Sequence, residues 1–164
     1  MKKILISFTL FILFIIFLFC VTSNYTNAVS NNLSNNFFRL HILANSDSEE
    51  DQKLKLKIRD NIIEFMNNEN FSSKEETIDY INNNKSKFYE IAEKTIYENG
   101  YNYSVNINIG NFYFPTKNYG NISLPAGLYD ALRVEIGEAK GQNWWCVMFP
   151  SLCFIDISSG VVDK

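Results

Sequence analysis

The sequence has few of the residues from which catalytic and metal-binding centres are usually built. In 164 residues there are one His, three Cys, seven Gly and three Pro. A single His, without carboxylates paired at ligand spacing, argues against a dedicated metal site. Asn45, Asp47 and Asp51 lie close together, but no Gly or distal Glu follows them at EF-hand spacing. The glycines form no phosphate-binding loop. We therefore expect no metal, no cofactor and no small-molecule substrate.

The chain also lacks an excess of positive charge. It contains 15 basic and 18 acidic residues, for a net charge of −3. All acidic residues follow Ala28, whereas Lys2 and Lys3 precede it, so removal of residues 1–28 would leave 13 basic and 18 acidic residues and a net charge of −5. Proteins that bind DNA or RNA neutralise phosphates with clustered Lys and Arg. Nucleic acid is therefore not an expected partner.

One long apolar run is present, at the N-terminus. It extends from Ile4 to Val21 and follows the basic start Met1-Lys2-Lys3. A basic start before an apolar core is typical of an export signal, but this run is longer than the usual core of roughly 7 to 15 residues. It reaches the length of about 17 residues at which a helix can span a membrane. Cleavage after Ala28 and retention as a membrane anchor therefore both remain open.

Composition divides the chain into three predicted segments. Residues 1–28 form a signal peptide or signal anchor, residues 29–36 a polar linker, and residues 37–164 a folded domain. The linker is rich in Asn and Ser and has little to bury. Apolar residues make up 46% of the chain and charged residues 20%, which is a globular rather than a disordered composition, and the length suits one domain.

The domain begins with the patterns of a strand and a capped helix. Apolar residues at 38, 40 and 42 alternate with Arg39 and His41, which indicates a half-buried strand. Directly afterwards, a Ser is twice followed three residues later by an acidic residue, a pattern that satisfies the free amides of a helix start. The two pairs are Ser46 with Glu49 and Ser48 with Asp51. A helix is therefore predicted from about residue 49 to residue 67.

A second helix is predicted from Ser73 to Gly100. Ser73 with Glu76 forms another capping box, and Gly is common at helix ends. One apolar stripe keeps its phase through most of this segment. Its members are Ile78, Ile81, Phe88, Ala92 and Ile96. We favour a single long helix, although the run Asn82-Asn83-Asn84 could interrupt it.

Strands dominate the remainder of the chain, where apolar residues alternate with polar ones. The expected strands cover residues 101–109, 112–114, 132–136 and 144–149. A turn is predicted at Gly110-Asn111, a loop over residues 119–127, and an antiparallel hairpin between the last two strands. The element order β-α-α-β-β-β-β predicts a single two-layer α+β domain, in which two helices pack on a largely antiparallel sheet of about five strands.

Cys146 and Cys153 are separated by six residues, with Pro150 and Ser151 available to bend the chain between them. In an exported chain two nearby cysteines are interpreted first as a disulfide and second as buried thiols. Closing so short a loop would stabilise the fold by about 2 to 3 kcal/mol in the chain-entropy model. A third interpretation makes one Cys a nucleophile with His41 as its base, which needs an activated, exposed thiolate. The apolar neighbours of both cysteines favour burial.

His41 shares a strand face with Arg39, opposite the apolar positions. A lone His in a strand is more often a hydrogen-bonded structural residue than a catalyst. Here it lies just before a helix start that carries further polar side chains. We predict a polar surface cluster of Arg39, His41, Asn45 and Asp47, and interpret it as part of a surface that recognises a protein partner.

Trp144 and Trp145 are adjacent, so they point to opposite faces of their strand. One is expected to face the core. The other either packs under a second layer or forms an exposed aromatic patch, and such patches often mark protein contacts. Both therefore belong to the candidate partner-binding residues.

Two blocks of the sequence concentrate its rare residues. RLHILANSDSEEDQKLKLKIRD runs from Arg39 to Asp60, and ALRVEIGEAKGQNWWCVMFPSLCF runs from Ala131 to Phe154. In these blocks, and in LPAGLYD directly before the second, the chain resembles the stage II sporulation protein R family. The likeness covers nearly all of the domain, although residues 67–118 match mainly in element order. The chain departs from the family pattern at Ala139, where Gly is common, and at Ser151, where a second Pro is common.

The resemblance implies a signalling protein of endospore formation. Proteins of this family are made in the forespore and exported towards the space between the forespore and mother-cell membranes. There they trigger a membrane-embedded aspartic protease of the mother-cell membrane, which removes the pro-sequence of sigma factor E. The resemblance therefore predicts a non-enzymatic activator, secreted or anchored by its N-terminal segment. The alternative from the residues is an exported hydrolase that uses Cys and His on cell wall or peptide.

Overall fold

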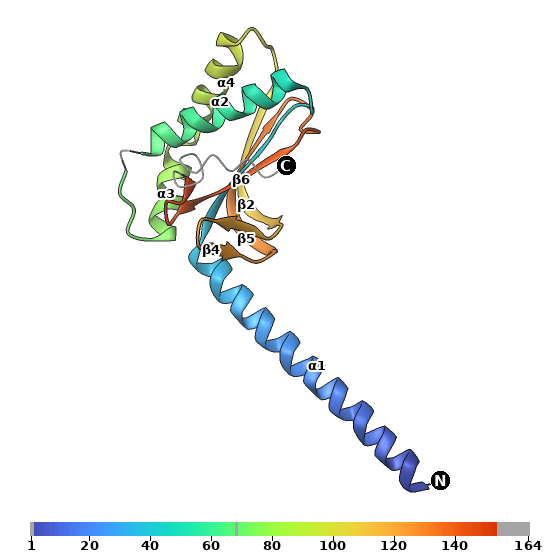
Figure 1. Ribbon diagram of the computed structural model, residues 1–164. Helices are drawn as coiled ribbons and strands as arrows, with labels where there is room; N and C mark the ends of the chain where they lie inside the picture. The colour runs from blue at the N-terminus through green and yellow to red at the C-terminus, as the bar shows by residue number, and fades with distance from the viewer. Residues whose placement is uncertain (1, 68, 154–164) are drawn as a thin grey trace. The chain divides into compact units, whose positions relative to one another are not determined.

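The computed structural model describes residues 2–67 and 69–153 (Figure 1). The chain divides into two compact units, Met1–Leu33 and Ser34–Lys164. The first unit consists of most of helix α1 (Lys2–Asn36). The second contains, in order, β1 (Phe38–Leu43), α2 (Glu49–Met66), α3 (Lys74–Asn83), α4 (Lys85–Glu98), β2 (Val105–Phe114), β3 (Lys117–Tyr119), β4 (Ile122–Leu124), β5 (Gly127–Ile136) and β6 (Asn143–Phe149).

Helix α1 contains the long apolar run, and neither Gly nor Pro interrupts it. Its stretch Ile6–Tyr25 has a mean hydropathy of 2.6 and is 0% buried. By length and composition this stretch could cross a membrane, and an N-terminal signal sequence has the same properties. The polar stretch 29–36 that we interpret as a linker is helical as well. Only Phe37 separates the helix from the first strand.

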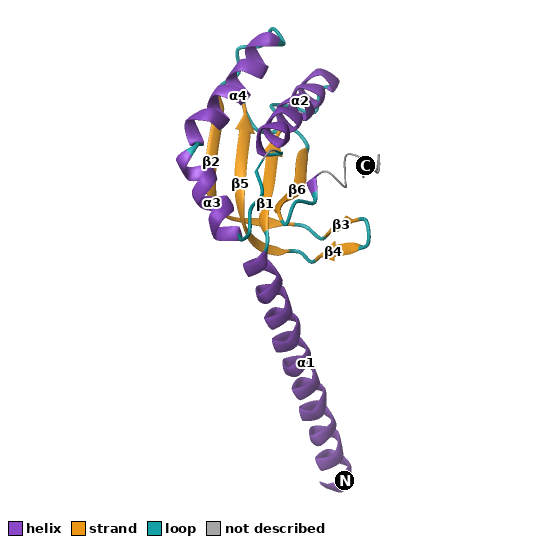
Figure 2. Cartoon of the chain, turned by 90° about the vertical axis from the view of Figure 1, so that its left-hand side faces the viewer, coloured by secondary structure: helices purple, strands orange, loops and turns teal. Residues whose placement is uncertain are grey.

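Strand β1 lies inside the main sheet, whose strand order is β2-β5-β1-β6 (Figure 2). It pairs in parallel with β5 and antiparallel with β6, so that Leu40 lies between Leu132 and Cys146. All six residues of β1 are buried, as in a strand covered on both faces. The predicted hairpin between the last two strands is therefore wrong. Neighbouring strands often pair, but here β1 lies between β5 and β6.

Strands β2 to β5 form one long β-ribbon, the bent hairpin of residues 105–136. The β3–β4 pair continues the register of the β2–β5 pair. Pro115 and Pro125 interrupt the ladder because proline has no amide to donate. Two predictions are wrong here: a single strand replaces the pair expected around Gly110, and the expected loop over 119–127 contains β4 and the end of β3. Gly110 does not turn the chain because residues on both sides of it pair with β5.

Both predicted helix starts are capped as expected. Ser48 Oγ accepts a hydrogen bond from the Asp51 amide at 3.2 Å, and Ser73 Oγ accepts one from the Glu76 amide at 3.1 Å. The prediction of one long second helix is wrong, because the chain leaves helical geometry at Asn84. Its side-chain amide donates to the carbonyl oxygen of Tyr80 at 2.9 Å, the kind of local bond by which Asn competes with a helix.

The three helices of the domain pack on one face of the sheet and complete a two-layer α+β fold. The apolar side chains of β1 at Phe38, Leu40 and Ile42 are fully buried there. Large side chains from α2, α3 and α4 cover them and share one core. These are Leu54, Ile58, Ile62, Ile81, Phe88 and Ile96. The other face of β1 carries Arg39 and His41, and side chains of the β-ribbon and of β6 bury these as well.

Candidate functional site

Arg39 lies in an aromatic box on the face of the sheet that the helices do not cover. Its side chain is fully buried, and the guanidinium carbon lies 4.0 Å from the ring centre of Phe114 and 4.8 Å from that of Tyr129. The third ring of the box is that of Tyr119, whose hydroxyl accepts a hydrogen bond from Nη2 of Arg39. All three rings belong to the β-ribbon. Among the described residues, Nε and Nη1 have no hydrogen-bond partner. Burial lowers the pKa of Arg39 from its ordinary value.

His41 lies next to this box and is 5% exposed. Its ring stacks on Trp145 with 3.8 Å between ring centres, and its Nε2 lies 2.9 Å from Oδ1 of Asn143. Because an amide oxygen only accepts, Nε2 carries the proton and Nδ1 is bare. Burial lowers the pKa of His41 to about 4, so the ring is neutral at neutral pH.

The predicted polar surface cluster is therefore wrong as a surface. Arg39 and His41 are buried under the ribbon and Trp145, while Asn45 and Asp47 lie in the β1–α2 connection. The sequence pattern showed that Arg39 and His41 share a face, but it could not show that the ribbon folds back over that face. Their role in binding a partner stays a prediction.

Asn45 and Asp47 join the β1–α2 connection to the loop between β5 and β6. Oδ1 of Asn45 accepts from the Glu138 amide at 2.9 Å, and Oδ1 of Asp47 accepts from the Gln142 amide at 2.7 Å. Gly137 has a φ of +57°, and a Cβ there would lie 2.2 Å from Oδ1 of Asn45. The two distinctive sequence blocks therefore interlock at this end of the sheet, and only glycine fits at position 137.

Asp51 holds the same connection from the first turn of α2. Its Oδ2 accepts from Asn45 Nδ2 at 2.8 Å and from Ser46 Oγ at 2.6 Å. Burial acts to raise the pKa of this carboxyl, but hydrogen bonds from Ser46, Asn45 and Tyr103 outweigh it and the pKa lies below its ordinary value. The charged carboxylate therefore stabilises the loop.

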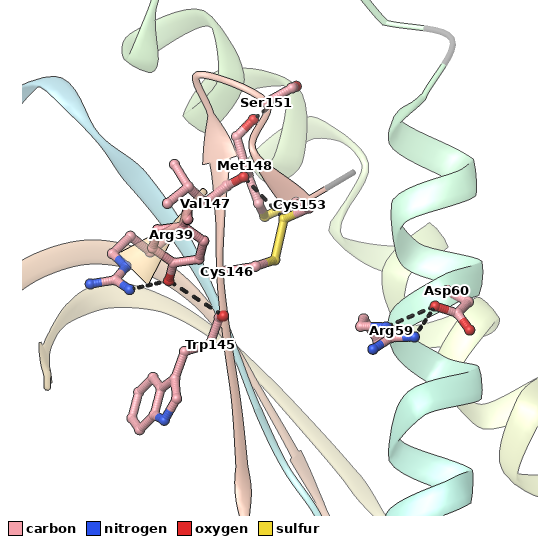
Figure 3. Close-up of a disulfide and its surroundings, with 10 residues drawn as sticks. Arg39, Arg59, Asp60, Trp145, Cys146, Val147, Met148, Ser151 and Cys153 are labelled. Atoms are coloured by element: carbon pink, nitrogen blue, oxygen red, sulfur yellow. Dashed lines mark hydrogen bonds and ion pairs between the residues drawn. A yellow bond between two sulfur atoms is a disulfide. The ribbon is translucent and has the colours of Figure 1, made fainter. Parts of the chain in front are cut away.

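Cys146 and Cys153 are joined in a disulfide, with 5.3 Å between their Cα atoms. This is the first of the three interpretations of the pair. Figure 3 shows the disulfide on the side of β6 that faces α2, while Arg39 and Trp145 lie on the opposite side. His41 stacks on Trp145, so the sheet separates its ring from both sulfur atoms. A catalytic pair of His41 with either cysteine is incompatible with this arrangement.

Trp144 and Trp145 point to opposite faces, as adjacent strand residues must, and both are partly buried. The guanidinium of Arg59 in α2 lies 4.1 Å from the ring centre of Trp144. Trp145 packs against His41 and lies 4.8 Å from the ring of Phe114. Each Trp therefore combines a packing role with remaining exposed surface.

An open groove of about 570 Å³ lies where α2, α3 and α4 meet. Its lining includes the carboxylates Glu64, Glu69 and Glu98 and the apolar side chains Phe65, Tyr80 and Ile91. Sequence reasoning missed it because these residues are spread over three helices and a loop. No group of His, Cys, Asp or Glu within the described residues is arranged to hold a metal ion.

Comparison with known proteins identifies the family. Residues 34–159 match the family described as stage II sporulation protein R (spore_II_R). The chain belongs to this family. It is 42% identical over 128 residues to stage II sporulation protein R of Bacillus subtilis (strain 168). The match covers 77% of this chain and 57% of the relative, so the chain spans little more than half of that protein's length. No solved structure matches.

Proposed function

We propose that this protein is an exported signal of the forespore that activates the membrane-embedded aspartic protease which processes pro-sigma-E in the mother cell. The observation that carries the proposal is membership of the stage II sporulation protein R family, with 42% identity to the Bacillus subtilis relative over the folded domain. The two sequence blocks that carry the resemblance interlock in the structure, so the matched residues form one structural unit.

Two features of the chain support an exported location. The apolar stretch Ile6–Tyr25 is long and hydrophobic enough for a signal peptide or a membrane anchor. The domain behind it contains a disulfide between buried cysteines, and disulfides persist in oxidising spaces outside the cytoplasm. We infer that the domain acts in the space between the forespore and mother-cell membranes.

The arrangement of polar side chains favours an activator over a hydrolase. A cysteine nucleophile needs a free thiolate beside a base, but both cysteines of the domain are bonded to each other and His41 lies across the sheet from them. The same imidazole is stacked on Trp145 and 5% exposed, so a substrate cannot reach it without moving other side chains. A protein that acts by binding has no need for such a pair.

The proposal is tested in a Bacillus subtilis strain that lacks its own stage II sporulation protein R. The full chain is expressed under forespore control, and pro-sigma-E processing is followed by immunoblot. Processing should return with the full chain and not with a chain whose signal, residues 1–28, is deleted. Restored processing by the cytoplasmic variant would contradict action across a membrane. No processing in a purified mixture of the protease, pro-sigma-E and this protein would contradict activation itself.

A further inference from the structure

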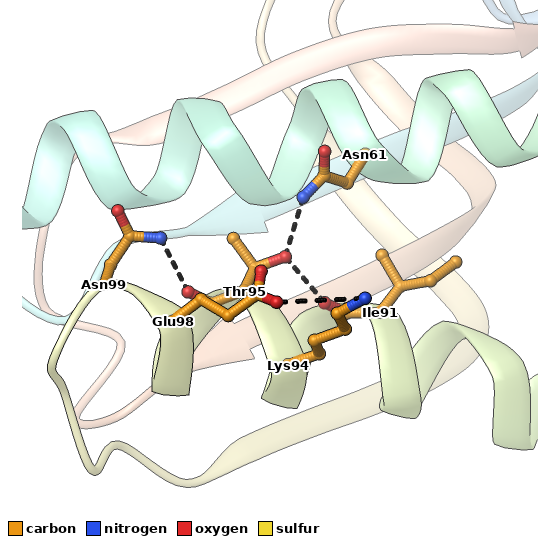
Figure 4. A network of polar contacts seen from close by, with 6 residues as sticks. All are labelled: Asn61, Ile91, Lys94, Thr95, Glu98 and Asn99. Atoms are coloured by element: carbon orange, nitrogen blue, oxygen red, sulfur yellow. Dashed lines mark hydrogen bonds and ion pairs between the residues drawn. The ribbon is translucent and has the colours of Figure 1, made fainter.

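The groove between α2, α3 and α4 has a defined floor and wall. Figure 4 shows Asn61 of α2 reaching Thr95 of α4, where its Nδ2 donates to Thr95 Oγ1 at 2.8 Å. The Thr95 hydroxyl in turn donates to the carbonyl oxygen of Ile91 at 2.7 Å. Thr95 is buried. This bond ties the two helices together beneath the groove and holds its two sides at a constant spacing.

The floor of the groove is aromatic and is continuous with the core. Phe65 lies 5.3 Å from Phe88 in an edge-to-face arrangement and 6.1 Å from Tyr80 between ring centres. Phe88 is fully buried, whereas Phe65 and Tyr80 are partly exposed and line the groove. Fixed aromatic rings at the bottom of an open groove offer both apolar surface and π faces to an occupant.

The rim of the groove is acidic. Glu64, Glu69 and Glu98 line it, and among the described lining residues Lys94 is the one with a cationic side chain. Lys94 lies 3.8 Å from Glu98, but both side chains are more than half exposed, so this pair is weak. In the described part of the chain, Glu64 and Glu69 form no ion pair, and Glu69 accepts only from the Tyr80 hydroxyl at 3.1 Å. The groove therefore carries excess negative charge over aromatic rings.

We propose that this groove binds a Lys or Arg side chain flanked by apolar residues, carried by an extracytoplasmic segment of the membrane protease. The inference rests on the proposed function for the identity of the partner. Charge complementarity selects a cation, since three carboxylates face one ammonium group across the groove, and the Tyr80 and Phe65 rings would add the cation–π attraction that Lys and Arg receive from aromatic rings. Apolar neighbours of that cation would cover Ile91 and the exposed part of Phe65.

The first experiment tests the chemistry of the groove without the protease. The full chain in zwitterionic detergent is titrated against a labelled, capped Arg-Leu-Arg-Leu-Arg peptide and, separately, against Glu-Leu-Glu-Leu-Glu. The variant Glu64→Lys/Glu98→Lys reverses two charges in the groove, at helix C-termini where Lys is tolerated. The control Asp79→Lys/Glu93→Lys makes the same charge change at exposed positions outside it. Thermal melts confirm that both variants fold.

We expect the cationic peptide to bind and the anionic peptide not to bind. The Kd for the cationic peptide should rise by about tenfold or more in the groove variant and by less than about twofold in the control, and high salt should weaken binding to the wild type. No preference for the cationic peptide, or an equal loss in both variants, overturns the inference, because net charge alone would then account for binding.

The second experiment applies the same two variants to activation of the purified protease. The groove variant should lose activation while the control retains it. If the wild type activates and the groove variant does so equally well, the protease does not use this groove and the inference fails. If the wild type binds the cationic peptide but never activates the protease, the proposed function fails and the cation-binding groove stands.

Discussion

The two faces of strand β1 are equally buried, yet they are built from different chemistry. On the helix side, Leu40 and Ile42 pack among apolar side chains in the ordinary way. On the ribbon side, Arg39 and His41 are enclosed by aromatic rings, and nitrogen atoms of both lack hydrogen-bond partners among the described residues. A buried guanidinium without an ion pair costs stability. We therefore expect the helix side to contribute more to stability, and the ribbon side to be the place to look for another role.

The largest expected effect tests the helix side of this comparison. Ile42→Ala removes a fully buried side chain from the centre of the sheet and leaves a cavity under the helices. Such truncations cost about 2 to 5 kcal/mol of unfolding free energy. Denaturant unfolding of the wild type and the variant gives this number. A loss below about 1 kcal/mol would mean that the helix layer is loosely packed and would break the comparison.

Removal of the disulfide is expected to have the next largest effect. Cys146→Ser/Cys153→Ser opens a short loop on the helix side of β6, and the loss should be about 2 to 3 kcal/mol. The measurement is the melting temperature with and without reductant, with the reduced wild type as the matched control. If the double variant is folded at permissive temperature but inactive in pro-sigma-E processing, the sulfur atoms have a role beyond stability.

The pH dependence of the unfolding free energy tests the ribbon face of β1, because His41 lies there and its charge state changes with pH. The pKa of its ring is about 4 in the folded protein and about 6.5 when unfolded, so the unfolded chain binds more protons between these values. Stability is therefore fully present above pH 6.5 and is lost as the pH falls towards 4. Between pH 7 and pH 5 the loss is about 2 kcal/mol. His41→Phe should remove this part of the pH dependence. If the variant shows the same pH profile as the wild type, the imidazole of His41 is not buried in solution.

The smallest expected change in stability is at Arg39. Arg39→Met keeps an unbranched, flexible side chain, although a shorter one, packs a thioether among the same rings and removes a buried charge, so the unfolding free energy should change by less than about 1 kcal/mol or increase. Lost activation by this stable variant would show that the charge serves signalling. A loss of several kcal/mol would instead show that the aromatic box stabilises the guanidinium fully and would remove the contrast between the two faces.

Local patterns predicted much of the fold but little of the candidate site. The helix starts at Ser48 and Ser73 follow from capping, because a cap involves residues only three apart. The pattern favours a single helix but leaves a break near Asn84 open, since the apolar stripe of the two helices stays in phase across it. The predicted pairing of β5 with β6 is wrong, because alternation shows which residues share a face but not which strand lies beside it.

The sequence by itself determined the family, the N-terminal apolar segment and the α+β class. It also determined which side chains of β1, and which Trp of β6, point to opposite faces of the sheet. These depend on residue identity and on periods of two or 3.6 residues, which act over short distances along the chain. Only the tertiary structure decided that β1 lies between β5 and β6, that the ribbon buries Arg39 and His41, and that three helices form an acidic groove. Each of these brings together segments tens of residues apart, and burial by such segments is set by packing of the whole domain.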